Sequence, residues 1–145
     1  MTHRRPAHQT QWAAQFAVAS ELCKRGYEVT FTTGNHPSID LMAYSPKQVP
    51  FAVDVKGLYK KNFWPVREKL ARKDLFYVLA FVPDDRPNRF FVLTQKQVNK
   101  GIRDNFLHVQ NRAKAKDKVL AHNPFPGVEW KFVERFESAW DSLPK

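Results

Sequence analysis

The chain has 145 residues, of which 43% are hydrophobic and 14% aromatic, and this composition predicts one folded domain over residues 1–145 and excludes a disordered polypeptide. Its 24 Lys and Arg residues outnumber 14 Asp and Glu residues, and the net charge of +10 favours a polyanionic partner such as nucleic acid. Cys23 is the only cysteine, so an internal disulfide is excluded, and the lack of a signal peptide or of about 20 consecutive apolar residues predicts a cytoplasmic protein without a membrane partner.

The first half of the chain predicts one helix followed by three strands. A basic N-terminal arm (residues 1–10) precedes a helix that ends at Gly26, and apolar residues in this helix recur at spacings of four, three and four. These residues, which we expect to form its buried face, are Trp12, Phe16, Ala19 and Cys23. The three strands are expected over residues 27–34, 39–44 and 51–57. A short turn with two prolines joins the second strand to the third, which favours an antiparallel meander.

Two further strands are predicted after a basic, aromatic-bearing connector (residues 58–73). No polar residue follows Asp74 in the segment 74–82, which is typical of a central strand buried on both faces. A fifth strand is expected over residues 89–94, where apolar residues predominate. The order α-β-β-β-connector-β-β-α therefore predicts an α/β fold with one sheet of about five strands flanked by helices.

The C-terminal third is expected to contain a helix over residues 95–106 and then a long loop over residues 108–128, because the latter is polar, basic and interrupted by two prolines. The last segment has aromatic residues at helical spacing, namely Phe132, Phe136 and Trp140. Residues 129–133 are also compatible with a short strand, and the sequence leaves both alternatives open.

Two opposite charges lie on one face of the third predicted strand. Asp54 and Lys56 are two residues apart, so on an extended chain their side chains point the same way, and Asp40 lies near the start of the preceding strand. Since the start of one hairpin strand lies opposite the end of the next, the three side chains are expected to converge. Two carboxylates this close repel each other unless a cation lies between them, and Mg²⁺ or Mn²⁺ prefers such oxygen ligands. The alternative interpretation of Asp54 and Lys56 is a salt bridge on a solvated face.

These charges belong to a longer motif between Gln15 and Gly57. A helix followed by "GYEV" precedes a hairpin with the pattern Asp-x(n)-Asp-x-Lys. This segment resembles the PD-(D/E)XK nuclease superfamily, which includes type II restriction endonucleases and archaeal Holliday-junction resolvases, and "GNHPSIDLMAY" is similar to its resolvase-like and uncharacterised bacterial branches. The resemblance implies a restriction endonuclease-like core with a mixed sheet. It also implies that Asp40 and Asp54 are metal-binding catalytic acids and that Lys56 is the catalytic lysine.

The superfamily further implies an acidic or amide residue on the first helix that faces the metal site. Gln15 and Glu21 are the candidates, and at about 100° per residue Gln15 lies near the border of the apolar face whereas Glu21 lies opposite it. We therefore assign Gln15 as the catalytic residue, with a cap on a neighbouring backbone group as the alternative. Pro37 departs from the motif because it precedes Asp40 by three residues. His36 in the same loop is either a contact to substrate or metal or a solvated side chain.

Basic residues are candidates for contacts to nucleic-acid phosphates. The six that we assign to nucleic-acid binding are Lys47, Lys60, Lys61, Arg67, Lys69 and Arg72. Tyr59 and Trp64 stand close to two of these lysines in sequence, and such a mixture of aromatic and basic groups is typical of segments that follow a phosphate backbone. For Phe63 and Trp64 we nevertheless prefer packing into the core.

The first functional hypothesis is a Mg²⁺- or Mn²⁺-dependent DNA endonuclease of the PD-(D/E)XK type, with branched or foreign DNA as candidate substrates. The alternative is a catalytically inactive nuclease-fold protein that binds nucleic acid or serves in assembly. A third class, a basic protein-interaction module, leaves Asp40 unexplained. DNA is the expected partner, and a homodimer is compatible with the sequence.

Overall fold

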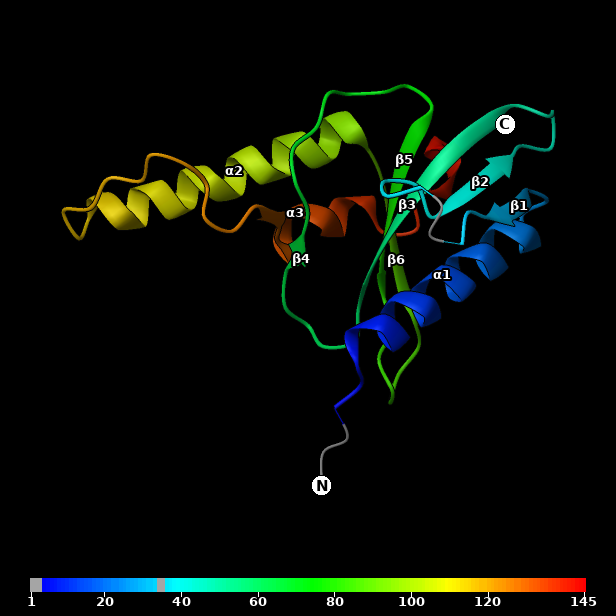
Figure 1. The fold of residues 1–145 in the computed structure, drawn as a ribbon, viewed down its shortest axis with the longest axis horizontal. Coiled ribbons are helices and arrows are strands. Elements are labelled where there is room, and N and C mark those ends of the chain that lie inside the picture. The colour runs from blue at the N-terminus through cyan, green and yellow to red at the C-terminus, as the bar shows by residue number, and fades with distance from the viewer. Residues whose placement is uncertain (1–3, 34–35) are drawn as a thin grey trace.

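A five-stranded mixed sheet forms the centre of the computed structural model, which describes residues 4–33 and 36–145 (Figure 1). In spatial order its strands are β1 (Glu28–Phe31), β2 (Leu41–Tyr44), β3 (Pro50–Leu58), β5 (Leu75–Phe81) and β6 (Arg89–Thr94). All neighbours are antiparallel except β3 and β5, which run parallel. Helices pack on both faces. The predicted α/β class with one mixed sheet of about five strands is therefore confirmed, as is the antiparallel meander of the first three strands.

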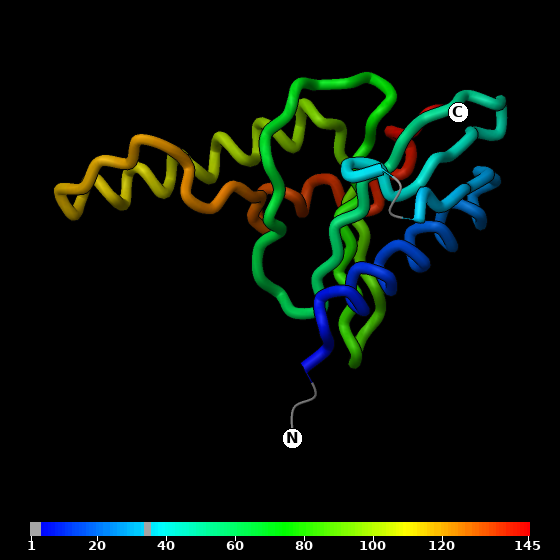
Figure 2. Tube along the Cα trace, viewed as in Figure 1, coloured from blue at the N-terminus to red at the C-terminus, as the bar shows by residue number. Residues whose placement is uncertain are grey.

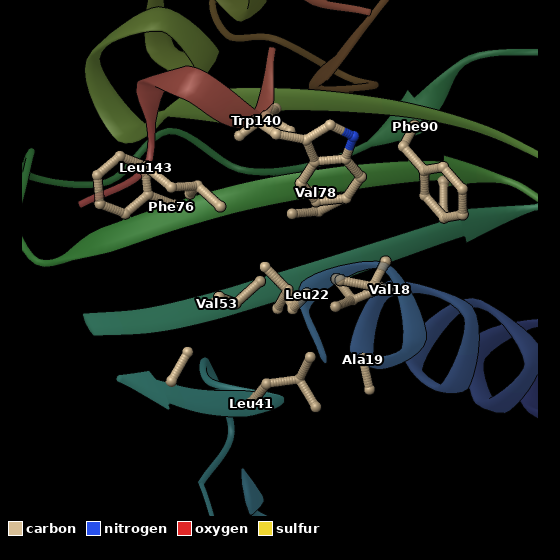
Figure 3. Close-up of a cluster of buried hydrophobic side chains, with 14 of the residues drawn as sticks. Val18, Ala19, Leu22, Leu41, Val53, Phe76, Val78, Phe90, Trp140 and Leu143 are labelled. Atoms are coloured by element: carbon tan, nitrogen blue, oxygen red, sulfur yellow. The ribbon is translucent and has the colours of Figure 1, made fainter. Parts of the chain in front are cut away.

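The first face of the sheet is covered by α1 (Ala7–Lys24). Val18 and Leu22 of this helix are fully buried against alternate residues of the strands, among them Val53 of β3 and Val78 of β5 (Figure 3). The helix can come this close because Gly57 has no side chain: a Cβ atom there would lie only 2.7 Å from the Ala14 Cβ atom. Burial of this apolar layer is the main stabilising contribution on this face.

The predicted buried face of this helix is wrong for three of its four residues. Trp12 and Phe16 are 44% and 59% exposed, and Cys23 is also exposed, whereas Ala19 is buried. The helix is apolar around much of its circumference, so spacing alone does not define one face. The close approach at Gly57 selects small residues, and the large rings of Trp12 and Phe16 instead stack on each other with their centroids 5.6 Å apart.

The second face carries α2 (Gln95–Lys114), α3 (Trp130–Val133) and a small sheet of β4 (Trp64–Pro65) and β7 (Gly127–Val128). Thr94 begins α2 with a capping box, in which its side chain accepts a hydrogen bond from the Gln97 backbone and the Gln97 side chain accepts one from the Thr94 backbone. The connector between β3 and β5 crosses this face and contributes β4 (Figure 2). It is this crossover that makes β3 and β5 parallel.

Two predicted helix boundaries are wrong. α2 continues to Lys114, within the predicted loop over residues 108–128. Its second half projects beyond the sheet (Figure 1). This half depends on the helix propensity of its residues, and it has no apolar stripe that would have marked it as a helix in the sequence. α1 begins at Ala7 within the predicted arm over residues 1–10. Residues 1–3 of that arm, and Gly34 at the end of the first predicted strand, lie outside the described residues.

The C-terminal segment is broken into short pieces rather than one helix. α3 is followed by two 3-10 turns, Glu134–Phe136 and Trp140–Ser142, and Ser138 between them has a φ of 53°. The alternative of a strand over residues 129–133 is therefore wrong. Among the residues that the structure describes, no helix is long and apolar enough to cross a membrane.

Replacement of Gly57 by alanine is expected to destabilise the fold by about 1–3 kcal/mol, because the new methyl group would overlap the Ala14 side chain. Chemical denaturation of the single variants and of the double variant Gly57→Ala with Ala14→Gly measures this. The double variant is expected to lose less than the sum of the two single losses. Additive losses would mean that the two residues are not in conflict.

Candidate active site

Asp54 is a buried acid on the central strand of the sheet. It is 1% exposed and points to the second face, where its partner in the parallel ladder with β5 is Tyr77. The Nζ atom of Lys56, two residues further on, lies 3.1 Å from Asp54 Oδ1, and the Lys56 side chain is 36% exposed. The salt bridge of the alternative interpretation is thus present, but the face that carries it is buried at Asp54 and not solvated.

The Asp54 carboxyl has an unfavourable environment for its charge. Burial raises its pKa, the positive charge of Lys56 opposes this increase, and the negative charge of Asp40 adds to it. Asp54 Oδ1 is buried, and among the described residues its partner is the Lys56 ammonium, without a further hydrogen-bond donor. The charge of this carboxylate is therefore balanced by one partly exposed cation.

Asp40 reaches the same strand through an irregularity at the start of β2. Leu41 is the partner of Val53, yet the Asp40 backbone also donates a hydrogen bond of 3.0 Å to the Val53 carbonyl, so two consecutive residues oppose one. This pattern is a β-bulge, which redirects the side chain that it contains. Asp40 Oδ2 accepts a hydrogen bond of 2.7 Å from the Val55 backbone. The expected convergence of Asp40 on the strand of Asp54 and Lys56 agrees with these contacts.

Two glutamines of α1 complete this edge of β3. Gln15 donates a hydrogen bond of 3.2 Å from Nε2 to Asp40 Oδ1, so the residue chosen from the helical geometry does face the site. Gln11, one turn earlier, donates from Nε2 to the Val55 carbonyl and accepts from the Gly57 backbone, with distances of 2.7 and 3.3 Å. Sequence reasoning missed Gln11. The signal that could have revealed it is the spacing of Gln11 and Gln15, which lie at i and i+4 on one face of the helix. Because β3 is longer than β2, its unpaired backbone groups need side-chain partners of this kind.

Glu21, the other candidate on this helix, lies elsewhere. Its side chain forms an ion pair with Arg25, with 2.6 Å between Glu21 Oε2 and Arg25 Nη1, and this bond lowers the pKa of its carboxyl. The His36 side chain is exposed, and its Nδ1 accepts a hydrogen bond of 3.3 Å from the Ser38 backbone. This contact is local to the loop and assigns His36 no role at the site.

A buried network of polar side chains connects β5, α2 and the connector next to the site. The Tyr77 hydroxyl donates a hydrogen bond of 2.8 Å to Gln95 Oε1, and Gln95 Nε2 donates one of 2.8 Å to Asn99 Oδ1. Asn99 then binds the backbone of Lys69, donating to its carbonyl at 2.6 Å and accepting from its N–H at 3.2 Å. Burial and the charge of Asp54 raise the pKa of Tyr77 to about 12, so it stays a neutral hydrogen-bond donor. The network holds the connector against the sheet and α2.

An open cleft of about 550 Å³ lies directly beside Lys56 and Tyr77. Its other lining residues come from the connector and from the segment before β7: Phe63, Pro65, Val66, Arg67, Lys69, Pro124, Phe125 and Pro126. Of the six cations assigned to nucleic-acid binding, the structure brings Arg67 and Lys69 to this cleft, together with Lys56. The Lys69 ammonium donates a hydrogen bond of 3.2 Å to Ser38 Oγ on the loop before Asp40.

The remaining four cations are dispersed. Lys60 and Lys61 are exposed just beyond the end of β3, and the Lys61 ammonium lies 4.9 Å from the centre of the Trp130 ring. Lys47 is in the turn before β3, at the opposite end of a nine-residue strand that spans roughly 30 Å. Arg72 forms an ion pair of 2.9 Å with Asp74, which neutralises part of its charge. These four do not share the cleft with Lys56.

The two aromatic residues of the connector have different environments. Trp64 is fully buried, as expected, with its ring centre 4.7 Å from that of Trp130. Phe63 is only half-buried and lines the cleft. Its position depends on Gly127, because a Cβ atom there would lie 2.3 Å from the Phe63 ring.

The carboxylates fit a hard divalent cation with a small protein ligand set. Within residues 4–33 and 36–145 no group of three His, Cys, Asp or Glu residues could hold a metal. Mg²⁺, however, is commonly held by one or two carboxylates together with water and substrate phosphates. Both oxygens of Asp40 retain lone pairs beyond the one bond that each accepts, and Asp54 Oδ1 retains lone pairs beyond its contact with the Lys56 ammonium.

Comparison of the chain with protein-family models, with curated proteins and with solved structures finds no match. Function must therefore be inferred from the side chains of the site itself.

Replacement of Asp54 by asparagine is expected to increase the free energy of unfolding at neutral pH by about 1 kcal/mol, because it removes a buried charge that lacks a full set of partners. The gain should shrink as the pH falls through the raised pKa of Asp54. Protonation then removes the same charge from the wild type, so the difference in stability between the two proteins closes. Urea unfolding at several pH values measures both effects. A destabilised variant would show that the pair with Lys56 is net stabilising.

Proposed function

We propose that the protein is a Mg²⁺- or Mn²⁺-dependent endonuclease of the PD-(D/E)XK type, with a restriction endonuclease-like core, that hydrolyses phosphodiester bonds in DNA. The observation that carries the proposal is the Asp54 carboxylate, which is buried and pairs with the partly exposed Lys56 ammonium at the edge of a cationic cleft. A buried carboxylate that depends on one partly exposed cation for its charge weakens the fold. A residue shaped by function tolerates this cost to stability.

Each charged side chain has a role in hydrolysis. Asp40 and Asp54 would hold the cation, which when bound lowers the pKa of a coordinated water and neutralises charge on the phosphate. Gln15 orients Asp40 through its amide. In the reaction, a water oxygen forms a bond to phosphorus while the ester bond to the leaving oxygen breaks. The products are a phosphate monoester and a hydroxyl group, with the proton of the attacking water balancing the leaving oxygen.

Lys56 lies where negative charge develops. Its ammonium group is partly exposed on the cleft side of Asp54, so it can contact a phosphate that the carboxylates themselves would repel. Arg67 and Lys69 line the same cleft and would bind phosphates on either side of the scissile bond. Neutralisation of the substrate therefore comes from three side chains on two separate segments of the chain.

A second candidate is a nuclease-fold protein that binds nucleic acid without cleaving it. The observation in its favour is that Gln15, a neutral amide, occupies the position on α1 next to Asp40, which leaves only two carboxylates for a cation. A cation held by two carboxylates alone is bound weakly unless a substrate phosphate completes its coordination.

The decisive measurement is Mg²⁺-dependent cleavage of branched and linear DNA. The wild type is expected to cleave, and Asp54→Asn and Lys56→Ala to lose about 10²-fold or more in rate. Asp104→Asn is a matched control, because Asp104 is an exposed acid on α2 that pairs with Lys100 away from the cleft. Cleavage by a stable Asp54→Asn variant at the wild-type rate would contradict the proposal. DNA binding without any cleavage by the wild type would select the second candidate.

A separate measurement tests the cleft cations. Because Arg67 lines the cleft and Lys47 lies at the far end of β3, Arg67→Ala is expected to reduce the slope of log affinity against log salt by about 1, and Lys47→Ala to leave it unchanged. The slopes are measured by fluorescence anisotropy with a labelled DNA duplex, over salt concentrations of about 50–300 mM. Equal effects of both variants would mean that phosphates are not bound preferentially at the cleft.

A further inference from the structure

The lining of the cleft beside Lys56 is of two chemical kinds. The cations Lys56, Arg67 and Lys69 supply one kind of lining, and aromatic and proline rings supply the other. A phosphate group needs only the cations. The apolar part is therefore left unexplained by hydrolysis of a phosphodiester bond.

The apolar wall joins segments that are far apart in the sequence. The ladder of β4 and β7 pairs Trp64 with Val128 and Pro65 with Gly127, and it continues with a hydrogen bond of 3.1 Å from the Val66 backbone to the Pro126 carbonyl. Through this ladder the residues before β7 are held against the connector. The wall is thus fixed by backbone pairing and by the contact of Phe63 with Gly127.

Phe125 is the most unusual residue of this wall. It is 74% exposed although it is a large aromatic side chain, and it stands between two prolines that restrict the local backbone. Burial in the fold does not account for a phenylalanine here. An exposed, positioned ring next to cations is instead the arrangement with which proteins stack nucleobases of single strands.

We propose that the cleft accepts an unpaired nucleobase from the same strand whose phosphate lies at Lys56, with the base stacked on Phe125 and the flanking phosphates at Arg67 and Lys69. This inference rests on the function proposed above and specifies its substrate class. The volume of about 550 Å³ is within the range of pockets that bind ligands of nucleotide size.

The apolar lining of the cleft would select DNA by its structure and not by its base sequence. Proline, valine and phenylalanine side chains carry no groups that read the edge of a base, whereas every base has a face that can stack. A base in a perfect duplex must leave its stack and its partner before it can enter, and a mismatched or single-stranded base needs less energy to do so. Branched, mismatched or single-stranded DNA is therefore the preferred substrate class.

The experiment uses oligonucleotides with 2-aminopurine, whose fluorescence is quenched by neighbouring stacked bases, measured without divalent cations. The probes are a single strand, a duplex with 2-aminopurine in a mismatch, and a perfect duplex. The wild type is expected to bind the first two at least 10-fold more tightly than the third and to change their fluorescence. Phe125→Ala should lose about 10-fold in affinity for the first two and little for the perfect duplex. Val119→Ala, which alters a residue 93% exposed in the same loop, should resemble the wild type.

The possible failures are distinguishable. If Phe125→Ala binds all three probes like the wild type, or if all three probes bind equally, the base pocket is wrong. The nuclease proposal then stands or falls on the cleavage assay alone. Sedimentation of both proteins without DNA tests a second copy as the occupant: a wild-type dimer that Phe125→Ala converts to a monomer would overturn the inference. So would binding of free adenosine monophosphate as tightly as the single strand, because the pocket would then serve a free nucleotide.

Discussion

The burial of the Asp54 carboxylate on β3 is the constraint around which the site is built. β3 lies between β2 and β5, so a side chain on it can reach solvent only over the end of the sheet or through a gap in the covering layer. Burial raises the pKa of an acid in this position and weakens the fold, and the positive charge of Lys56 offsets only part of that cost. Within the described residues Oδ1 of this acid has the Lys56 ammonium as its partner and no further hydrogen-bond donor, which is less compensation than stability alone would favour.

A second feature follows from the length of β3. It extends beyond the start of β2, so part of its backbone has no strand as a partner on that edge. Side chains form these hydrogen bonds instead, namely Gln11 from α1 and Asp40 from the bulge. The contacts that satisfy these backbone groups also hold Asp40 in place, and Asp40 in turn binds Gln15. Formation of the site and completion of the sheet edge are therefore one structural event, and we expect residues here to affect stability and activity together.

The covering layer on the second face is incomplete beside Lys56. The network from Tyr77 through Gln95 and Asn99 fixes the connector at Lys69, and the ladder of β4 and β7 fixes it again near Trp64. Between these two attachments the cleft remains open beside Lys56. Rigid attachment at both ends is what allows an open, cationic cleft to keep a defined shape.

The sequence by itself determined the strand order along the chain, the full burial of β5 and the grouping of Asp40, Asp54 and Lys56, because alternation and hairpin geometry are local properties. Helical geometry likewise identified Gln15. Only the tertiary structure decided that α1 buries Ala14 rather than Trp12, since that choice depends on Gly57 of a strand more than 40 residues away. It also decided which cations share the cleft. Arg67 and Lys69 meet Phe125 there through the pairing of β4 with β7, two strands of two residues each, and strands this short have no periodicity for a sequence to display.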